Sequence, residues 1–125
     1  MDSPQQIQRV LVVDDEPALL KAVVTILEGT GFQVFTAKNG KEARAKASEH
    51  QIDLLITDLG MPDVNGRQVA EKIKAASPRT PVIMLTGWGA MLQERGPEAA
   101  LVDAILSKPP RANELVQTLT KLAGK

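Results

Sequence analysis

The sequence predicts a three-layer, doubly wound α/β fold, in which helices cover both faces of a five-stranded parallel sheet. Two observations predict it. Short apolar runs alternate along the chain with longer segments whose apolar residues recur every three or four positions, the spacing of an amphipathic helix. Most of the short runs are continuously apolar, which is typical of strands buried on both faces. Strands and helices that alternate in this way build a parallel sheet with right-handed crossovers.

Five apolar runs predict the strands of the sheet. Four of them lack polar alternation and are expected to be covered on both faces, whereas the remaining run alternates more and suits an edge strand. The alternating run is 33–37, and the others are 10–13, 54–56, 82–85 and 104–106.

The first helix is predicted over residues 17–28. It begins with Pro17, whose missing N–H is not needed in a first helical turn. Gly29 and Gly31 are expected to end it. Its apolar residues at helical spacing are Leu20, Val23, Val24 and Leu27.

Further helices are predicted between the later runs. Segments 41–49 and 66–76 follow the second and third strands, and Asn113 is expected to cap a last helix. The stretch 87–100 contains three glycines and a proline, so any helix there should be short or broken. The core-facing residues of these helices are Ala43, Ala47, Val69, Ile73, Leu115, Leu119 and Leu122.

Length and composition restrict the class of protein. The chain has 125 residues, of which 43% are hydrophobic and 24% charged, so we expect one globular domain over 1–125 with its core at about 8–123. Lys and Arg number 15, as do Asp and Glu, and this zero net charge argues against direct nucleic-acid binding. The absence of cysteine excludes disulfides and thiolate metal sites. Aromatic residues make up only 2%, too few for a base-stacking platform.

The sequence also bears on location. No apolar run reaches the roughly 18–20 residues of a membrane-spanning helix, and the polar N-terminus lacks the apolar segment of a signal peptide. We therefore expect a cytoplasmic protein without membrane insertion, which agrees with the absence of cysteine. His50 is the only histidine, so a histidine-rich metal site is excluded, and His50 is expected to be a solvated residue at a helix end.

Reactive side chains follow four of the five predicted strands. Asp14 and Asp15 follow the first run, Asp58 the third, Thr86 the fourth and Lys108 the fifth. In open α/β sheets, sites form just beyond the carboxyl ends of the strands. We therefore expect three carboxylates, one hydroxyl and one ammonium group to converge at one edge of the sheet.

Three clustered carboxylates repel one another unless a cation joins them. Ligands that are all oxygen point to a hard divalent ion, Mg²⁺ first, which favours one or two carboxylates, waters and phosphate oxygens. A phosphoryl group fits the remaining parts, because Lys108 supplies charge and Thr86 a hydroxyl donor. Asp58 is the best candidate for a covalent acceptor, since it stands alone at the end of a central strand, while Asp14 and Asp15 would hold the ion.

Plainer interpretations exist for each of these residues taken singly. Asp14 and Asp15 could be acids that stabilise a helix N-terminus, Thr86 could cap a turn, and Lys108 could be a surface lysine. Their combination argues against these interpretations, because the carboxylates would otherwise crowd without a partner. Glu16 is expected to be an ordinary solvated acid.

Five short segments lie in a characteristic order along nearly the whole chain. They are Leu11-Val12-Val13-Asp14-Asp15-Glu16, Asp58-Leu59-Gly60-Met61-Pro62, Asn65-Gly66, Leu85-Thr86-Gly87 and Lys108-Pro109. Together they resemble the receiver domain of two-component response regulators, a domain that also occurs in hybrid histidine kinases. The resemblance implies the flavodoxin-like strand order 2-1-3-4-5.

The resemblance also implies a role for each acid of the site. Asp58 would accept a phosphoryl group from a phosphohistidine or a small acyl phosphate. Mg²⁺ would be bound directly by Asp15, Asp58 and the backbone carbonyl of Gly60, with Asp14 contributing through water or a longer contact. Such a transfer needs positioning and charge neutralisation more than covalent help from the protein.

Two further residues would read the transferred group. By the same resemblance, Lys108 would pair with the phosphoryl oxygens, and Thr86 would move toward them and reshape the loop that follows. One position departs from the family pattern: Ile105 stands three residues before Lys108, where family members usually carry Tyr or Phe. We therefore expect signalling to rely more on loop rearrangement than on an aromatic switch.

Several functions remain open at this point. The foremost is a signalling module that catalyses only its own phosphorylation and dephosphorylation, with a histidine kinase or phosphotransfer protein and an unidentified effector as partners. A Mg²⁺-dependent aspartyl-phosphate phosphatase or phosphotransferase is an alternative, but such enzymes use a D-x-D pair rather than adjacent acids such as Asp14 and Asp15. A flavodoxin-like cofactor binder is disfavoured by the low aromatic content, and a non-phosphorylated docking domain by the complete set of site residues.

Overall fold

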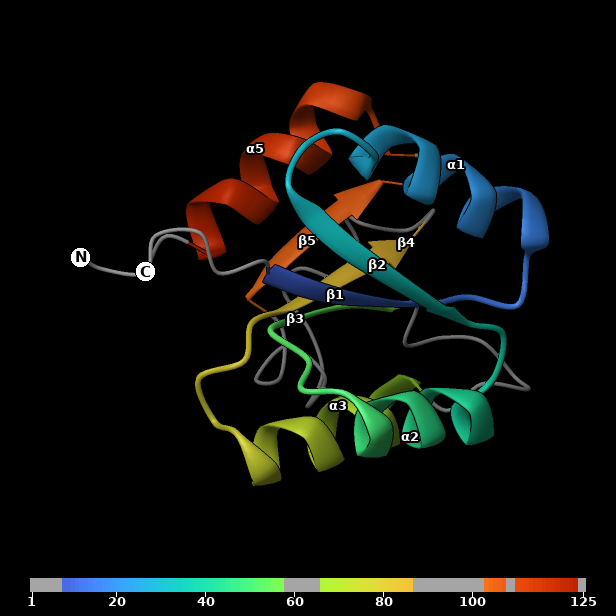
Figure 1. The fold of residues 1–125 in the computed structure, drawn as a ribbon, viewed down its shortest axis with the longest axis vertical. Coiled ribbons are helices and arrows are strands. Elements are labelled where there is room, and N and C mark those ends of the chain that lie inside the picture. The colour runs from blue at the N-terminus through green and yellow to red at the C-terminus, as the bar shows by residue number, and fades with distance from the viewer. Residues whose placement is uncertain (1–7, 58–65, 87–102, 108–109, 124–125) are drawn as a thin grey trace.

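The computed structural model describes residues 8–57, 66–86, 103–107 and 110–123, without the side chains of residues 66, 67 and 86 (Figure 1). Strands and helices alternate along the described chain. In order they are β1 (Gln8–Val13), α1 (Pro17–Leu27), β2 (Phe32–Ala37), α2 (Gly40–Glu49), β3 (Leu54–Thr57), α3 (Gly66–Ala76), β4 (Val82–Thr86), β5 (Ala104–Ser107) and α5 (Ala112–Ala123).

The described strands form one parallel sheet in the order β2-β1-β3-β4-β5. This confirms the predicted class and the strand order that the resemblance implied. It also confirms β2 as an edge strand. Val13, at the end of β1, pairs with Ala37 of β2 on one side and with Thr57 of β3 on the other. The carboxyl ends of these strands therefore meet at one edge of the sheet.

Two apolar clusters fill the space between the sheet and its helices. Figure 1 shows α1 and α5 together on one face of the sheet and α2 and α3 together on the other. Successive side chains of a strand point to opposite faces. Accordingly, Val10 and Val12 pack in the cluster beneath α1 and α5, whereas Leu11 and Val13 pack in the cluster beneath α2 and α3. This burial on both faces explains the continuously apolar runs of β1, β3 and β4. For 104–106 the expectation of cover on both faces was wrong, because β5 is the other edge of the sheet and is only partly buried.

Helix α1 begins with Pro17 and ends before Gly29 and Gly31, which adopt positive φ angles of 82° and 92°. Its start and its glycine stop confirm the prediction. The buried stripe differs slightly from the predicted one: Leu19, Val23 and Leu27 are buried, while Leu20 is only partly buried at the side of the cluster. The apolar stripe of α1 is wider than the contact of the helix with the sheet. The sequence alone therefore does not show which apolar residues lie at the centre of that contact.

The remaining helix starts show how local signals compete with packing. In α2, the side chain of Asn39 accepts a hydrogen bond from the backbone N–H of Glu42, and Glu42 accepts one from the N–H of Lys38, so the two caps support each other. In α5, the predicted cap at Asn113 is wrong, because the helix begins at Ala112 and already includes it. A cap contributes about 1 kcal/mol, and the burial of the leucines of α5 outweighs it.

The buried hydroxyl group of Thr57, at the end of β3, is expected to lower the stability of the protein. It is fully buried, and among the described residues its hydroxyl oxygen has no hydrogen-bond partner. Burying an unsatisfied polar group costs about 1–3 kcal/mol. Thr57→Val keeps the side-chain shape and removes the hydroxyl, so it should raise the free energy of unfolding by about 1 kcal/mol in urea titrations. The reverse change Val82→Thr, at another fully buried position, should lower it. A less stable Thr57→Val protein would contradict the argument.

Candidate functional site

The candidate site begins where β1 ends. Asp14 follows Val13 and is fully buried. Its backbone N–H donates to the carbonyl of Ala37 at the end of β2, 3.1 Å away, and its Oδ1 accepts from the backbone N–H of Glu16 at 3.0 Å. A carboxylate that accepts a hydrogen bond two residues ahead forms a tight turn of the Asx type. The turn fixes the Asp14 carboxylate between the sheet edge and the start of α1.

The next two acids are placed differently. Asp15 and Glu16 are exposed. Glu16 starts α1 with its backbone, since its carbonyl accepts from the N–H groups of Leu19 and Leu20 at 3.1 and 3.2 Å, and its side chain makes no capping hydrogen bond. Glu16 is therefore a solvated helix-start acid, as predicted. All three carboxylates lie near the positive end of the α1 dipole, which favours negative charge.

The strand register brings the predicted site segments to the same edge. Val13 pairs with Thr57, and these residues directly precede Asp14 and Asp58 in the sequence. Thr86, the last residue of β4, pairs with Ser107 of β5. Asp58, Gly60 and Lys108 lie outside the described residues, and only the backbone of Thr86 is described. The structure thus places Asp14, Asp15 and the backbone of Thr86, and leaves the other three as predictions.

The donor set at the end of β1 suits a hard cation. Asp14 supplies a buried carboxylate and Asp15 an exposed one on adjacent residues. The chain has no cysteine, and its one histidine, His50, lies at the end of α2 and not beside these acids. One or two carboxylates, with positions left for water and phosphate oxygens, is the arrangement that Mg²⁺ prefers. The described residues therefore fit a magnesium ion.

Two acids at the opposite edge of the sheet have a structural role that the sequence analysis missed. Asp53 precedes β3, and its Oδ2 accepts from the N–H of Arg9 while its own N–H donates to the Arg9 carbonyl, both at 2.8 Å. Asp103 precedes β5 and repeats this pattern with Val82, at 2.8 and 2.7 Å. It also pairs with Lys74 at 2.9 Å. Each aspartate extends the hydrogen-bond ladder between two strands by one residue. The sequence signal for this role was the position of each aspartate directly before an apolar run.

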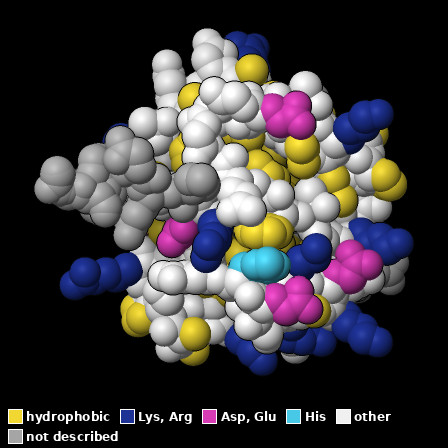
Figure 2. Space-filling view, in the orientation of Figure 1, with side chains coloured by type: hydrophobic (Ala, Val, Ile, Leu, Met, Phe, Trp, Pro, Cys, Tyr) yellow, Lys and Arg dark blue, Asp and Glu magenta, His cyan; other side chains and the backbone are white. Residues whose placement is uncertain are grey.

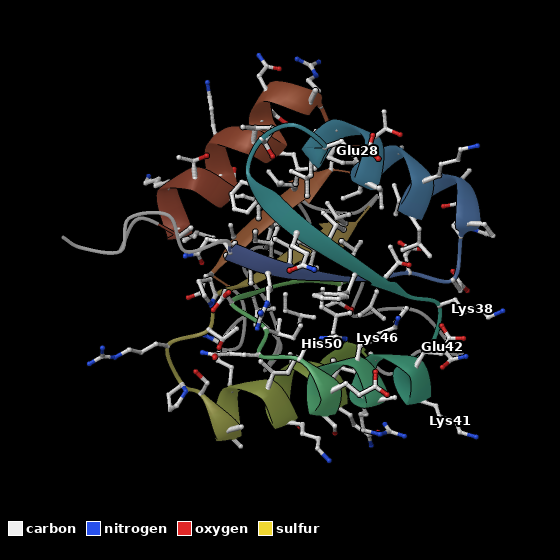
Figure 3. The ribbon with its side chains drawn as sticks, in the orientation of Figure 1. Glu28, Lys38, Lys41, Glu42, Lys46 and His50 are labelled. Atoms are coloured by element: carbon white, nitrogen blue, oxygen red, sulfur yellow. The ribbon has the colours of Figure 1, made fainter. Side chains whose placement is uncertain are left out.

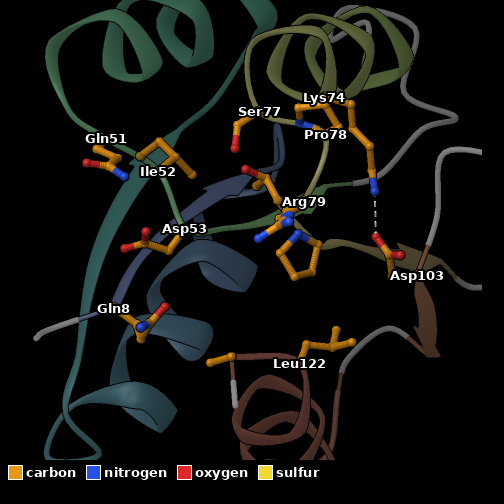
Figure 4. Close-up of a pocket in the computed structure, with 13 residues that line it drawn as sticks. Gln8, Gln51, Ile52, Asp53, Lys74, Ser77, Pro78, Arg79, Asp103 and Leu122 are labelled. Atoms are coloured by element: carbon orange, nitrogen blue, oxygen red, sulfur yellow. Dashed lines mark hydrogen bonds and ion pairs between the residues drawn. The ribbon is translucent and has the colours of Figure 1, made fainter. Parts of the chain in front are cut away.

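These aspartates line a cavity of about 710 Å³ at the amino edge, shown in Figure 4. The dashed line in Figure 4 is the ion pair of Lys74 with Asp103. Both carboxylates are engaged with the backbone of neighbouring strands, so the cavity is built from parts that hold the sheet together. It lies at the other end of the strands from Asp14 and Asp15.

The prediction for His50 is confirmed in part. It caps the C-terminus of α2 through its backbone, so its helix-end position is confirmed. Its ring, however, stacks on Phe35 of β2, with ring centroids 4.1 Å apart, and its side chain is 35% exposed. The sequence did not predict this stacking, because the contact joins residues of different elements and leaves no trace in the local pattern.

Fold and site together define a class of protein. A parallel sheet of order 2-1-3-4-5 with helices on both faces is the flavodoxin-like form of the doubly wound fold, and the acids at the end of β1 lie where this fold places its sites. Residues 10–120 match the family model of the response regulator receiver domain, and the chain belongs to this family of signal-transduction domains.

Three relatives illustrate the family. The chain is 34% identical over 114 residues to the transcriptional regulatory protein TrcR of Mycobacterium tuberculosis, covering 91% of this chain and 44% of that protein. It is 33% identical over 121 residues to the sensor protein GacS of Pseudomonas syringae, covering 93% and 13%. The crystal structure of the response regulator TrrA of Thermotoga maritima, in complex with Mg²⁺-BeF, has a TM-score of 0.80 at 31% identity, covering 93% and 99%.

The chain thus spans less than half the length of TrcR and about an eighth of GacS. Among the described residues, no helix combines the length and apolar character needed to cross a bilayer.

Proposed function

We propose that this receiver domain accepts a phosphoryl group on Asp58 from a phosphohistidine, in a reaction that requires Mg²⁺, and that the phosphoryl group then changes its conformation and partner binding. One observation carries the proposal. Val13 and Thr57 are register partners in adjacent parallel strands, and each is followed directly by an aspartate in the sequence. Strand ends that meet in this way suit a shared acidic site.

The proposed magnesium ligands are the carboxylates of Asp15 and Asp58 and the backbone carbonyl of Gly60, with Asp14 acting through water or a longer contact. The burial of Asp14 and the exposure of Asp15 support this division, because an exposed carboxylate can reach an ion that keeps part of its water shell. The complex of TrrA with Mg²⁺-BeF supports it as well, since beryllium fluoride is a tetrahedral anion that resembles a phosphoryl group.

In the proposed transfer, a carboxylate oxygen of Asp58 bonds to phosphorus as the bond from phosphorus to the histidine nitrogen breaks, and the imidazole leaves. Bound Mg²⁺ would neutralise charge that develops on the phosphoryl oxygens. The ammonium group of Lys108 would pair with these oxygens, and the hydroxyl of Thr86 would donate to them. The pairing of Thr86 with Ser107, the residue before Lys108, supports their placement on one side of the acceptor.

The proposed output works through the segment after β4. Ile105 lies in β5, one strand from Thr86, and is partly buried. An aliphatic side chain at this position has no ring to turn inward when Thr86 moves. We therefore place the change in the chain that follows Thr86. Residues 87–102 lie outside the described residues, so this remains a proposal.

The proposed partners are a histidine kinase or phosphotransfer protein that donates the phosphoryl group and an effector that reads it. The names of two relatives are in keeping with such a signalling role, since TrcR is a transcriptional regulatory protein and GacS a sensor protein. We propose a cytoplasmic location, because that is where a kinase would donate the phosphoryl group. As the domain we propose residues 1–125, with the core at about 8–123.

Phosphorylation is tested by incubating the protein with acetyl phosphate and Mg²⁺ and measuring its intact mass. We expect one added phosphoryl group, which is absent when Mg²⁺ is chelated and absent in Asp58→Asn. Turnover of a small phosphate ester that Asp58→Asn leaves unchanged would instead support a phosphatase. An unmodified wild-type mass would support a domain that only docks partners.

Metal binding is tested by thermal unfolding with and without Mg²⁺. At a hundredfold excess over its dissociation constant, Mg²⁺ should stabilise the wild type by about 2.7 kcal/mol, or several degrees in Tm. Asp15→Asn should lose this stabilisation. The matched control is Glu16→Gln, at the neighbouring exposed acid, which should keep it. Equal loss in both variants would point to general charge screening.

Lys108→Ala separates phosphorylation from response. We expect this variant to keep its Mg²⁺-induced shift in Tm but to show much smaller phosphorylation-induced changes in backbone amide chemical shifts, because the ammonium group that reads the new charge is gone. Lys121→Ala, at an exposed lysine of α5, should respond like the wild type. Loss of metal binding with an intact response would reverse the assigned role.

A further inference from the structure

Strand β2 is an edge of the sheet without the usual protection against pairing. Natural edge strands are blunted by charged side chains, proline or bulges. Residues 32–37 of β2 contain no charged residue and no proline, and they pair with β1 in an unbroken register. Aromatic and β-branched residues, which favour strands, make up most of the segment. Figure 2 views the face that carries β2 and shows His50 there beside exposed hydrophobic atoms.

The hydrogen bonds identify which backbone groups face outward. The Ala37 carbonyl accepts from the N–H of Asp14, which follows β1, and therefore points toward β1. Peptide groups alternate between the two edges of a strand. The groups of Gln33 and Phe35 therefore also face β1, and those of Phe32, Val34 and Thr36 face away from the sheet. Three N–H and three carbonyl groups of β2 thus lie on its outer edge.

We propose that this edge pairs with β2 of a second copy of the chain, antiparallel and about a twofold axis at Val34. In this register Val34 faces Val34 of the second copy, and Phe32 faces Thr36. Each facing pair exchanges two hydrogen bonds, so all outward groups of both strands are satisfied. Shifting the register leaves some of them unpaired. The two sheets then join into one, and the interface is isologous, as in most symmetric dimers.

The side chains also suit this register. Phe32, Val34 and Phe35 are only partly buried within one chain. Pairing covers Phe32 and Val34 on one face of the joined sheet and sets Gln33 opposite Phe35 on the other. The stack of Phe35 on His50 holds that ring in place before pairing. Cross-strand contacts of aromatic and β-branched residues stabilise antiparallel pairs.

Charge at the ends of β2 favours a second copy in antiparallel orientation. Exposed Glu28 lies before the strand, and exposed Lys38 and Lys41 lie after it, as Figure 3 shows. In an antiparallel pair, the end of β2 that follows Glu28 in one copy lies beside the end that precedes Lys38 and Lys41 in the other, so opposite charges gather at each end of the paired strands. Parallel pairing would bring like charges together. The inference depends on β2 and its flanks and not on the phosphorylation of Asp58.

Sedimentation at micromolar to millimolar concentrations tests the pairing. The wild type should dimerise with rising concentration. In Val34→Pro, the proline removes an N–H that faces outward, which an edge strand tolerates, so circular dichroism should be preserved. The dimer loses two hydrogen bonds, and its dissociation constant should rise about tenfold or more. A wild type that stays monomeric at millimolar concentration overturns the proposal, even if the edge captures an extended peptide from another protein.

Substitutions of the charged residues that flank β2 test the antiparallel orientation and leave the sequence of the strand unchanged. Glu28→Lys should weaken the dimer about threefold or more, because like charges then gather at each end of the paired strands. Adding Lys38→Glu and Lys41→Glu in the same chain should restore it. All three side chains are exposed, so folding should be preserved. Unchanged dimerisation throughout the series would contradict the antiparallel register.

Single cysteines test the axis, since the chain has no cysteine of its own. In the proposed register the Cα atoms of Val34 lie about 5.5 Å apart, within the reach of a disulfide. Val34→Cys should therefore cross-link to itself on oxidation. Gln33→Cys is the control: its thiol is more exposed, yet its two copies are offset diagonally by about 7–8 Å and should cross-link poorly. Faster cross-linking of Gln33→Cys would contradict the proposed axis.

Discussion

The parallel pairing of β1 with β3 is the constraint on which the structure depends. It sets Val13 beside Thr57, so that the segments following both strands begin at one edge of the sheet. Parallel strands need crossover connections, and the helices in those connections cover the sheet on both faces. The same pairing therefore accounts for the continuously apolar runs, the two core clusters and the edge at which the acids lie.

Parallel pairing also explains why aspartates at the two edges have different roles. Asp53 and Asp103 precede strands, and their carboxylates accept from the backbone N–H groups of Arg9, near the start of β1, and of Val82, at the start of β4. These donors are thereby satisfied at the edge of the ladder. Asp14 follows a strand, where the chain turns into α1 and the helix dipole favours negative charge. The acids before the strands extend the ladder. The acids after β1 stand beside a helix start, which suits ligands for an ion or a phosphoryl group.

Much of the fold could be predicted from the sequence, because strand burial and helix amphipathicity leave local patterns. The strand order could not, since apolar runs of similar composition do not state which of them pair, and it came from the family resemblance. Local patterns also failed at Asn113, where packing of α5 outweighed a cap, and at His50, whose partner Phe35 belongs to another element. For the site, Asp14 and Asp15 were found at the predicted edge. The roles of Asp58, Gly60, Thr86 and Lys108 stay predictions.

Pairing through β2 is compatible with a site at the carboxyl edge. In an antiparallel pair, the end of β2 in one copy lies beside the start of β2 in the other. The carboxyl edges of the two sheets therefore point in opposite directions, and the acids that follow β1 remain apart. Because Ala37 at the end of β2 accepts the hydrogen bond from Asp14, the joined sheet would still be connected to each acidic site. A dimer of this kind would stiffen β2 without covering Asp14 or Asp15, so a partner could approach either site.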